Sequence, residues 1–388
     1  MSGSSLLLPQ ADRSLLAYRP NPAPPTFSPP ATPIRSRVAY AAAHVVRDPL
    51  GRETGETSVD WEATLAFREY LWRLGLGVAE AMDTAQRGMG LDHEATRLLI
   101  TRSCEAARAV GGNIACGAGT DQLPPGARVS LDAIATAYEE QCAHVEASGG
   151  RVVLMASRHL AATARGAEDY AVVFDRVLTQ VSEPVIVHWL GPAFDPALEG
   201  YWGSEDLDEA TDVCVDLLTR HAAKVAGIKL SLLDDQREIA LRRRLPDGVR
   251  MFTGDDFHYP ELILGDGDAT SDALLGIFDA IAPAASVALQ ALDAGNEARF
   301  LEILEPTVPL SRAIFEAPTY HYKTGIVFLA YLNGFQNHFR MFAGLESARS
   351  IVHLSTVFAL ADRAGLLRDP ELATHRMRLT LQLSGIDT

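Results

Sequence analysis

The chain has 388 residues, 47% of them apolar and 22% charged, which suits one large core with additions or two domains. Thirty-four basic and fifty acidic residues give a formal charge of −16, which argues against nucleic acid or an anionic membrane as a partner. No apolar run approaches the roughly 20 residues of a spanning helix, and no secretion signal is recognisable, so we expect a cytoplasmic protein.

The four cysteines predict neither a zinc site nor a disulfide framework. They lie far apart in the sequence and form no CxxC pair. We expect buried thiols at Cys104, Cys116, Cys142 and Cys214.

Residues 1–35 are expected to form an extended amino-terminal arm. The segment from Arg19 to Pro33 contains seven prolines, a density that prevents a helix or an interior strand and favours a polyproline-like conformation.

From about Ser36, short β-rich runs alternate with longer amphipathic stretches, a pattern typical of βα units with parallel strands. The amphipathic stretches carry apolar residues at helical spacing. Their ranges are Trp61 to Leu74, His93 to Val110, Leu131 to Ala147, Ala167 to Gln180, Leu207 to His221 and Gln236 to Leu245. Eight strands are predicted, at Arg37 to Ala43, Gly77 to Met82, Gly112 to Cys116, Arg151 to Met155, Pro184 to Trp189, Ala226 to Leu230, Val249 to Thr253 and Ser271 to Gly276.

Eight strands alternating with helices predict an α/β fold, a (β/α)8 TIM barrel over residues 36–295. An open doubly wound sheet is disfavoured because no GxGxxG loop follows the first strand. Residues 296–388 contain no further strand and predict a carboxy-terminal helical region. Its helices are expected at Asn296 to Ala317, Thr324 to Phe342 and Leu345 to Ala364. The aromatic cluster Tyr320-His321-Tyr322 is expected to serve packing or a subunit interface.

Lys229 is the first candidate for chemistry because it ends the sixth predicted strand. Alternation along that strand places Gly227, Lys229 and Ser231 on one side, and reactive residues of barrels come from the carboxyl ends of strands. Burial would lower the pKa of the amine and make it a nucleophile toward a ketone. The alternative is a surface lysine paired with Asp234 or Asp235.

The other predicted strand ends carry histidines and aspartates, which also suit zinc or manganese. No HxH or HxxxH pair supports a metal site, and the lysine would compete with a cation, so no metal and no other cofactor is predicted.

Two turns resemble those of the dihydrodipicolinate synthase and N-acetylneuraminate lyase family. They are Gly227-Ile228-Lys229 at the sixth strand and Phe252-Thr253-Gly254-Asp255-Asp256 at the seventh. The resemblance implies a class I aldolase on a barrel, with Lys229 as the Schiff-base lysine, and a homodimer or homotetramer. It covers roughly Arg37 to Leu345. Further matches are Val59-Asp60-Trp61, Leu91-Asp92-His93-Glu94 and Pro184-Val185-Ile186-Val187.

The departures from the family bear on the substrate. The family's turn after the second strand, Gly-Thr-Thr-Gly-Glu, grips the carboxylate of pyruvate, and here it reads Asp83-Thr84-Ala85-Gln86-Arg87. Only Thr84 matches, and Asp83 would repel an anion, so a pyruvate donor is disfavoured. The family's catalytic tyrosine aligns with His188, which can move a proton near neutral pH. Tyr201, in the following loop, is the alternative source of a phenol.

The candidate substrate-binding residues, besides Asp83, come from two strand ends. Asp255, Asp256 and His258 could hold hydroxyl groups, with a capped turn as the alternative. Arg158 could clamp a carboxylate or phosphate beside His159, with a structural ion pair as the alternative.

The leading hypothesis is a class I lyase that cleaves or dehydrates a keto-sugar, keto-polyol or sugar-acid derivative in carbohydrate catabolism. Lys229 forms the Schiff base, His188 moves the proton and Thr84 orients it. The alternatives are a metal-assisted sugar isomerase or dehydratase, and a barrel that binds a sugar without catalysis.

Overall fold

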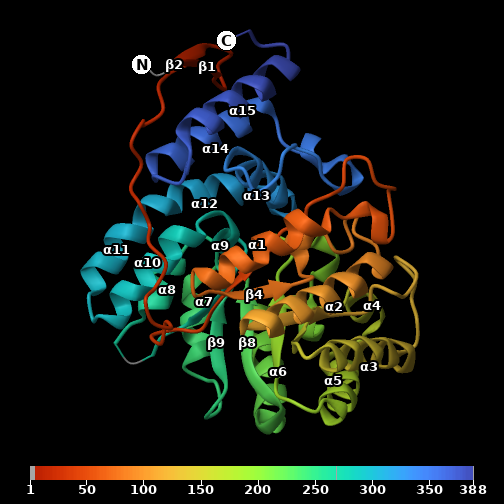
Figure 1. Ribbon diagram of the computed structural model, residues 1–388. Coiled ribbons are helices and arrows are strands. Elements are labelled where there is room, and N and C mark those ends of the chain that lie inside the picture. Colours follow the sequence, from red (N-terminus) through yellow and green to blue (C-terminus); the bar gives the residue numbers. More distant parts are fainter. Residues whose placement is uncertain (1–4, 268, 388) are drawn as a thin grey trace.

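Eight parallel strands close into a barrel in the computed structural model, which describes residues 5–267 and 269–387 (Figure 1). Each strand pairs with its neighbours in sequence, and β10 pairs with β3 to close the ring. The predicted TIM barrel is confirmed, and all eight strands lie where the sequence indicates. They are β3 (Ala39–Ala42), β4 (Gly77–Glu80), β5 (Ile114–Ala118), β6 (Arg151–Leu154), β7 (Val185–Leu190), β8 (Val225–Ser231), β9 (Arg250–Thr253) and β10 (Asp272–Leu275).

Helices follow the strands and surround the barrel, and several begin at capping residues that the sequence shows. Asp60, Asp92 and Ser130 each accept a hydrogen bond from a backbone N–H in the first turn of their helix. The helices of the barrel are α1 (Trp61–Arg73), α2 (His93–Val110), α3 (Leu131–Ser148), α4 (Arg158–Thr163), α5 (Ala167–Gln180), α6 (Leu207–Arg220), α7 (Asp235–Arg242), α8 (Tyr259–Leu264), α9 (Ile277–Ala280) and α10 (Ala282–Asp293).

Apolar and aromatic side chains fill the amino-terminal half of the barrel. Tyr40 packs against Phe252, and its hydroxyl donates to Asn113 Oδ1 at 3.0 Å. A Cβ at Gly227 would lie 2.6 Å from the Phe252 ring, so the inward side of β8 has room only for glycine at this depth. Polar groups therefore collect at the carboxyl ends of the strands.

The carboxy-terminal helices differ in detail from the prediction. The segment predicted as the first helix forms two helices, separated by a 3-10 turn at Glu305–Thr307 that contains Pro306. The second ends at Leu332, because Gly334 has a φ of 82°. The last helix was not predicted, although Asp369 caps it and Pro370 begins it. The helices are α11 (Glu297–Leu304), α12 (Val308–Ile314), α13 (Tyr322–Leu332), α14 (Ile351–Arg363) and α15 (Pro370–Leu383). Of these, α12 to α15 lie together at one end of the barrel and α11 lies beside α10 (Figure 1).

The amino-terminal residues join the helical region to the barrel. A hairpin that was not predicted, β1 (Leu6–Pro9) with β2 (Leu15–Tyr18), meets α14 through Tyr18, whose hydroxyl donates to Asp362 Oδ2 at 2.7 Å. The proline-rich segment then runs without helix or strand to α10, where the Ser36 N–H donates to Asp293 Oδ1 at 2.6 Å. The division of the chain at residues 35 and 295 stays a prediction.

Two further findings concern the described residues as a whole. The four cysteine side chains are buried, as expected. In residues 5–267 and 269–387, no helix combines the length and apolar character needed to cross a membrane.

Candidate active site

Lys229 projects into a small cavity at the carboxyl end of the barrel. The side chain is 8% exposed, and the cavity encloses about 20 Å³, enough for one water molecule. Gly254 makes room for it, because a Cβ there would lie 2.8 Å from Lys229 Cε. The cavity's polar lining, besides Lys229, comprises Asp83, Thr84, His188, Ser231, Asp256 and Tyr322.

Burial sets the protonation of Lys229. Loss of water around the amine lowers its pKa from 10.5 to about 8, while the carboxylates of Asp256 and Asp83 act in the opposite direction. A substantial fraction of the amine is therefore neutral in mildly alkaline solution. The neutral form is the nucleophile that a carbonyl group requires.

Asp256 is the acidic neighbour of Lys229. It is 3% exposed, and its Oδ1 accepts from the Ile277 N–H at 2.9 Å. Burial raises the pKa of this carboxyl to about 7, against the lowering effects of the Ile277 N–H and the Lys229 ammonium. The lysine and the aspartic acid thus line one cavity, and burial moves the pKa of each toward neutrality.

His188 lies beside Lys229 on the neighbouring strand. The two are direct register partners of β7 and β8, and His188 Nε2 is 3.2 Å from Ser231 Oγ. Burial, together with the charge of Lys229, lowers the His188 pKa well below its usual value. Its Nδ1 is buried and has no partner among the described residues. The imidazole is therefore a neutral base with one nitrogen free to act.

Thr84 reaches the cavity from the turn after β4 and meets Tyr322, whose aromatic cluster was expected to serve packing or a subunit interface. Its Oγ1 lies 2.8 Å from the hydroxyl of Tyr322, the first residue of α13. Tyr322 is fully buried and stacks on Phe315, and burial raises its pKa well above that of a free phenol. The helical region therefore supplies the phenol beside Lys229. The aromatic cluster around Tyr322 was the only sequence signal for it.

Asp83 is neutralised by a second lysine that the sequence analysis missed. Lys323 Nζ lies 2.7 Å from Asp83 Oδ2 and also donates to the Tyr320 carbonyl at 3.0 Å. The Lys323 side chain is 1% exposed, and burial lowers its pKa. Asp83 is thus half of an ion pair, and the repulsion of anions expected from it alone is reduced. The chain has three lysines, and two of them are at this site.

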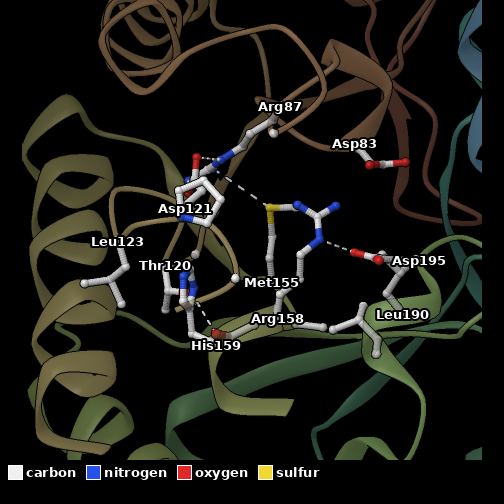
Figure 2. A pocket seen from close by; sticks show the side chains of 17 residues that line it. Asp83, Arg87, Thr120, Asp121, Leu123, Met155, Arg158, His159, Leu190 and Asp195 are labelled. Carbon is white, nitrogen blue, oxygen red and sulfur yellow. Dashed lines mark hydrogen bonds and ion pairs between the residues drawn. The ribbon is translucent and has the colours of Figure 1, made fainter. Parts of the chain in front are cut away.

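A larger cavity, the outer chamber, adjoins the lysine cavity and encloses about 190 Å³ (Figure 2). Asp83 and Leu190 line both cavities. The structure places both Arg158 and His159 in the outer chamber, at the start of α4. Arg158 pairs with Asp195 through Nε, and His159 Nδ1 lies 3.0 Å from Thr120 Oγ1.

Three of the candidate residues, Tyr201, Asp255 and His258, line neither cavity. Tyr201 is buried beside Tyr170 and its hydroxyl accepts from the Ser157 N–H at 3.2 Å, so it supports the loop after β6. Asp255 accepts from the N–H groups of Phe257 and His258 at 2.7 and 3.0 Å, and its Oδ2 is 3.0 Å from His258 Nδ1. Asp255 and His258 therefore close a turn, which leaves Asp256 as the member of this group that lines the cavity.

The turn after β4 also differs from a carboxylate-binding loop. The Gln86 side chain donates to the Phe342 carbonyl at 3.0 Å and accepts from the Phe342 N–H at 3.2 Å. Arg87 is fully engaged with Asp121, Gln141 and backbone carbonyls. Both side chains fasten the turn to its surroundings.

No group of three or more His, Cys, Asp or Glu side chains in residues 5–267 and 269–387 is arranged to hold a metal ion. The expectation of a site without metal or other cofactor stays a prediction.

The barrel and its inward lysine define a fold of the dihydrodipicolinate synthase type, which confirms the resemblance at the level of fold. A pyruvate complex of a prophage protein of that family from E. coli K12 aligns with a TM-score of 0.64 at 13% identity, over 90% of this chain and 98% of its own. Dihydrodipicolinate synthase from Aquifex aeolicus aligns with a TM-score of 0.60 at 15% identity, over 90% of this chain and 98% of its own. A putative dihydrodipicolinate synthetase from Pseudomonas aeruginosa aligns with a TM-score of 0.64 at 14% identity, over 84% of this chain and 99% of its own.

The sequence profile of the family described as "Protein of unknown function (DUF993)" matches residues 6–386, and the chain belongs to this family. No curated protein matches the sequence.

Proposed function

We propose that the protein is a class I lyase that forms a Schiff base between Lys229 and a carbonyl substrate. The observation that carries the proposal is a buried amine at the carboxyl end of a barrel strand, with its pKa lowered to about 8. A surface lysine paired with Asp234 or Asp235 would be exposed, whereas Lys229 is enclosed with Asp256, His188 and Tyr322. The fold shared with the dihydrodipicolinate synthases supports the same reaction type.

The first step is addition of the neutral Lys229 amine to the carbonyl carbon, which forms a C–N bond and places a proton on the former carbonyl oxygen. Loss of that oxygen as water gives an iminium ion. The Thr84–Tyr322 hydroxyl pair can deliver and remove these protons, because the two oxygens lie 2.8 Å apart at the edge of the cavity.

The iminium ion then accepts the electron pair of a broken bond. In retro-aldol cleavage a base removes the proton of a hydroxyl group, the adjacent C–C bond breaks and its electrons form an enamine. His188 suits this role because its imidazole is neutral and its Nδ1 has no partner among the described residues. Protonation of the enamine and hydrolysis of the iminium return the amine and release the second product.

The substrate in this proposal is a keto-sugar, a keto-polyol or a sugar-acid derivative. Support comes from the turn after β4, where Gln86 and Arg87 are committed to structural contacts and do not form a carboxylate nest. His188, Ser231 and Asp256 offer hydrogen-bonding groups to hydroxyls next to the carbonyl. A role in carbohydrate catabolism, a cytoplasmic location and a homodimer or homotetramer complete the proposal.

Borohydride trapping tests the reaction type. The protein is incubated with one ketose or keto acid at a time and reduced with borohydride. Its intact mass is then measured by mass spectrometry. We expect a covalent adduct with at least one hydroxylated ketone, and none in the Lys229→Ala variant. A panel of ketoses and keto acids that leaves the mass unchanged would contradict a Schiff-base enzyme and favour a barrel that only binds its ligand.

A further inference from the structure

The outer chamber borders the lysine cavity and is about ten times its volume, 190 Å³ against 20 Å³. Its walls are largely apolar, with Leu123, Met155 and Leu198 beside Leu190. Because the lysine cavity holds only a few atoms, a substrate longer than its carbonyl end has to extend past Asp83 and Leu190 into this chamber. The polar groups of the chamber therefore help to determine which substrate binds.

Most of those polar groups are already satisfied. Arg87 uses all five of its N–H groups: Nε and Nη2 on Asp121, Nη2 also on Gln141, and Nη1 on the carbonyls of Ala81 and Gly117. Asp83 is neutralised by Lys323 at 2.7 Å. Neither ion pair leaves a free cation in the chamber.

A chain of hydrogen bonds satisfies the inner wall. His159 Nε2 faces the Pro124 carbonyl at 3.0 Å, which only accepts, so Nε2 carries the proton and Nδ1 can accept from Thr120. Thr120 in turn lies 2.6 Å from Ser157 Oγ, which also accepts from the Leu160 N–H at 3.0 Å. This wall presents no unpaired donor to a ligand.

Arg158 is different, because most of its donors have no partner. Its Nε donates to Asp195, and among the described residues no acceptor is hydrogen-bonded to its Nη1 or Nη2. The side chain is 46% exposed and crosses the chamber in Figure 2. Gly88, with a φ of 70°, lies against it, and a Cβ there would come within 3.0 Å of Nη1. Asp195 thus holds the guanidinium at Nε, and the Nη1 and Nη2 N–H groups are available to a ligand.

We propose that the outer chamber is the subsite for the far end of the substrate, and that this end is a carboxylate or a phosphate bound by Arg158. The inference rests on the proposed function, because it assumes that one substrate occupies both cavities. A guanidinium edge with paired N–H groups matches the two oxygens of such an anion. The neighbouring ion pairs Asp83–Lys323 and Arg87–Asp121 are internally balanced, and the carboxylate of Asp195 contacts Arg158 through Nε, away from the edge offered to the anion.

The substrate class follows from this arrangement. It is a hydroxylated ketone with an anionic group at the end opposite the carbonyl, that is, a keto-sugar acid or a ketose phosphate. The apolar walls and the closed hydrogen-bond chain accommodate the carbon backbone, and Arg158 supplies the charge recognition.

Calorimetric titration with polyhydroxylated compounds that have no ketone or aldehyde group tests this subsite independently of Schiff-base chemistry. The probes are D-gluconate for the carboxylate, D-glucitol 6-phosphate for the phosphate and D-glucitol as the neutral reference. We expect at least one anion to bind the wild-type protein about 10-fold more tightly than D-glucitol, as a charge-assisted pair of roughly 1.5 kcal/mol implies. Whichever anion binds more tightly identifies the end group.

Three variants assign the preference to Arg158. Arg158→Gln should abolish the preference, so that the anions bind no more tightly than D-glucitol does to the same variant, while Arg158→Lys should retain part of it because the charge remains. Arg165→Gln is the matched control: this side chain is 89% exposed, lies outside the chamber and should leave the preference intact. Equal binding of all three probes by the wild type, or a preference that persists in a folded Arg158→Gln variant, would overturn the subsite. If trapping fails while Arg158-dependent binding succeeds, the reaction is wrong and the subsite stands.

Discussion

His188 and Lys229 are directly paired residues of neighbouring strands, and the pairing brings the charge of the lysine close to the buried imidazole. Burial and the positive charge of Lys229 together keep the imidazole neutral. The carboxyl of Asp256, with a pKa near 7, adds an acid that titrates close to the amine. In the proposed mechanism these three groups act as nucleophile, base and acid, and all of them line one small cavity at the carboxyl end of the barrel.

The first prediction concerns pH. The neutral amine is the reactive form, so modification of Lys229 by an amine reagent should rise with pH around a midpoint near 8. Asp256→Asn should move the midpoint to lower pH, because it removes a negative charge that stabilises the ammonium. Peptide mass spectrometry after short labelling pulses measures both, and the small number of lysines makes the assignment simple. A midpoint above pH 10 would show that the amine is solvated.

The second prediction concerns the hydroxyl pair. Tyr322→Phe and Thr84→Val should each slow adduct formation by roughly 100-fold, the range of general acid–base catalysis. Because the hydroxyls are hydrogen-bonded, the double variant should lose little more than either single one. The rate of borohydride trapping provides the measurement.

A phenol elsewhere in the barrel is the control for this pair. Tyr40→Phe also removes a buried hydroxyl hydrogen bond, to Asn113, but at the amino end of the barrel. It should leave the trapping rate unchanged. Equal effects of Tyr40→Phe and Tyr322→Phe would mean that the loss is structural.

The third prediction concerns the buried ion pair Asp83–Lys323. Lys323→Met should lower the free energy of unfolding by roughly 3 kcal/mol or more, because it leaves a poorly solvated carboxylate without its partner. The double variant Asp83→Asn/Lys323→Met should recover much of the loss. Arg243→Gln, which breaks an exposed ion pair with Asp266, should cost less than about 1 kcal/mol. Urea denaturation compares the variants, and a cost for Lys323→Met no larger than that for Arg243→Gln would contradict the buried pair.

The fourth prediction concerns Glu238, which lies outside the site. Burial raises its pKa from 4.5 to about 8, against the effect of its hydrogen bond from Ser271. Between pH 5 and pH 8 the folded protein therefore binds this proton more strongly than the unfolded chain, and the carboxyl makes stability fall as pH rises. Glu238→Gln removes that dependence, so the stability of the variant relative to wild type should increase over this range by roughly 2–4 kcal/mol. Urea denaturation at three pH values would detect it, and a constant difference would refute the raised pKa.

The sequence was sufficient to predict the barrel and Lys229 because both rest on local patterns. Strand and helix periodicities are properties of short segments. The carboxyl ends of all strands in a parallel barrel lie at the same end of the barrel, so a residue at such an end can be placed there from the sequence. The sequence also indicated that His188 lies at the carboxyl end of a strand and that Asp256 follows one, and both line the lysine cavity.

The rest of the site depends on tertiary packing that no local pattern encodes. Tyr322 reaches the cavity, and Lys323 reaches Asp83, only because α13 packs over the barrel, more than 200 residues after Thr84 and Asp83. Tyr201 was plausible because it follows β7, yet its loop turns toward Tyr170 and Trp202.

Location of the trapped adduct tests the central claim most directly. The protein is reduced with borohydride in the presence of a ketose phosphate, a keto-sugar acid and a neutral ketose in turn, then digested and sequenced by mass spectrometry. We predict that the adduct lies on Lys229 and not on Lys224 or Lys323, and that it is absent from Lys229→Ala. An adduct on Lys323, or an equal amount of adduct in Lys229→Ala, would contradict the assignment of Lys229 as the Schiff-base residue.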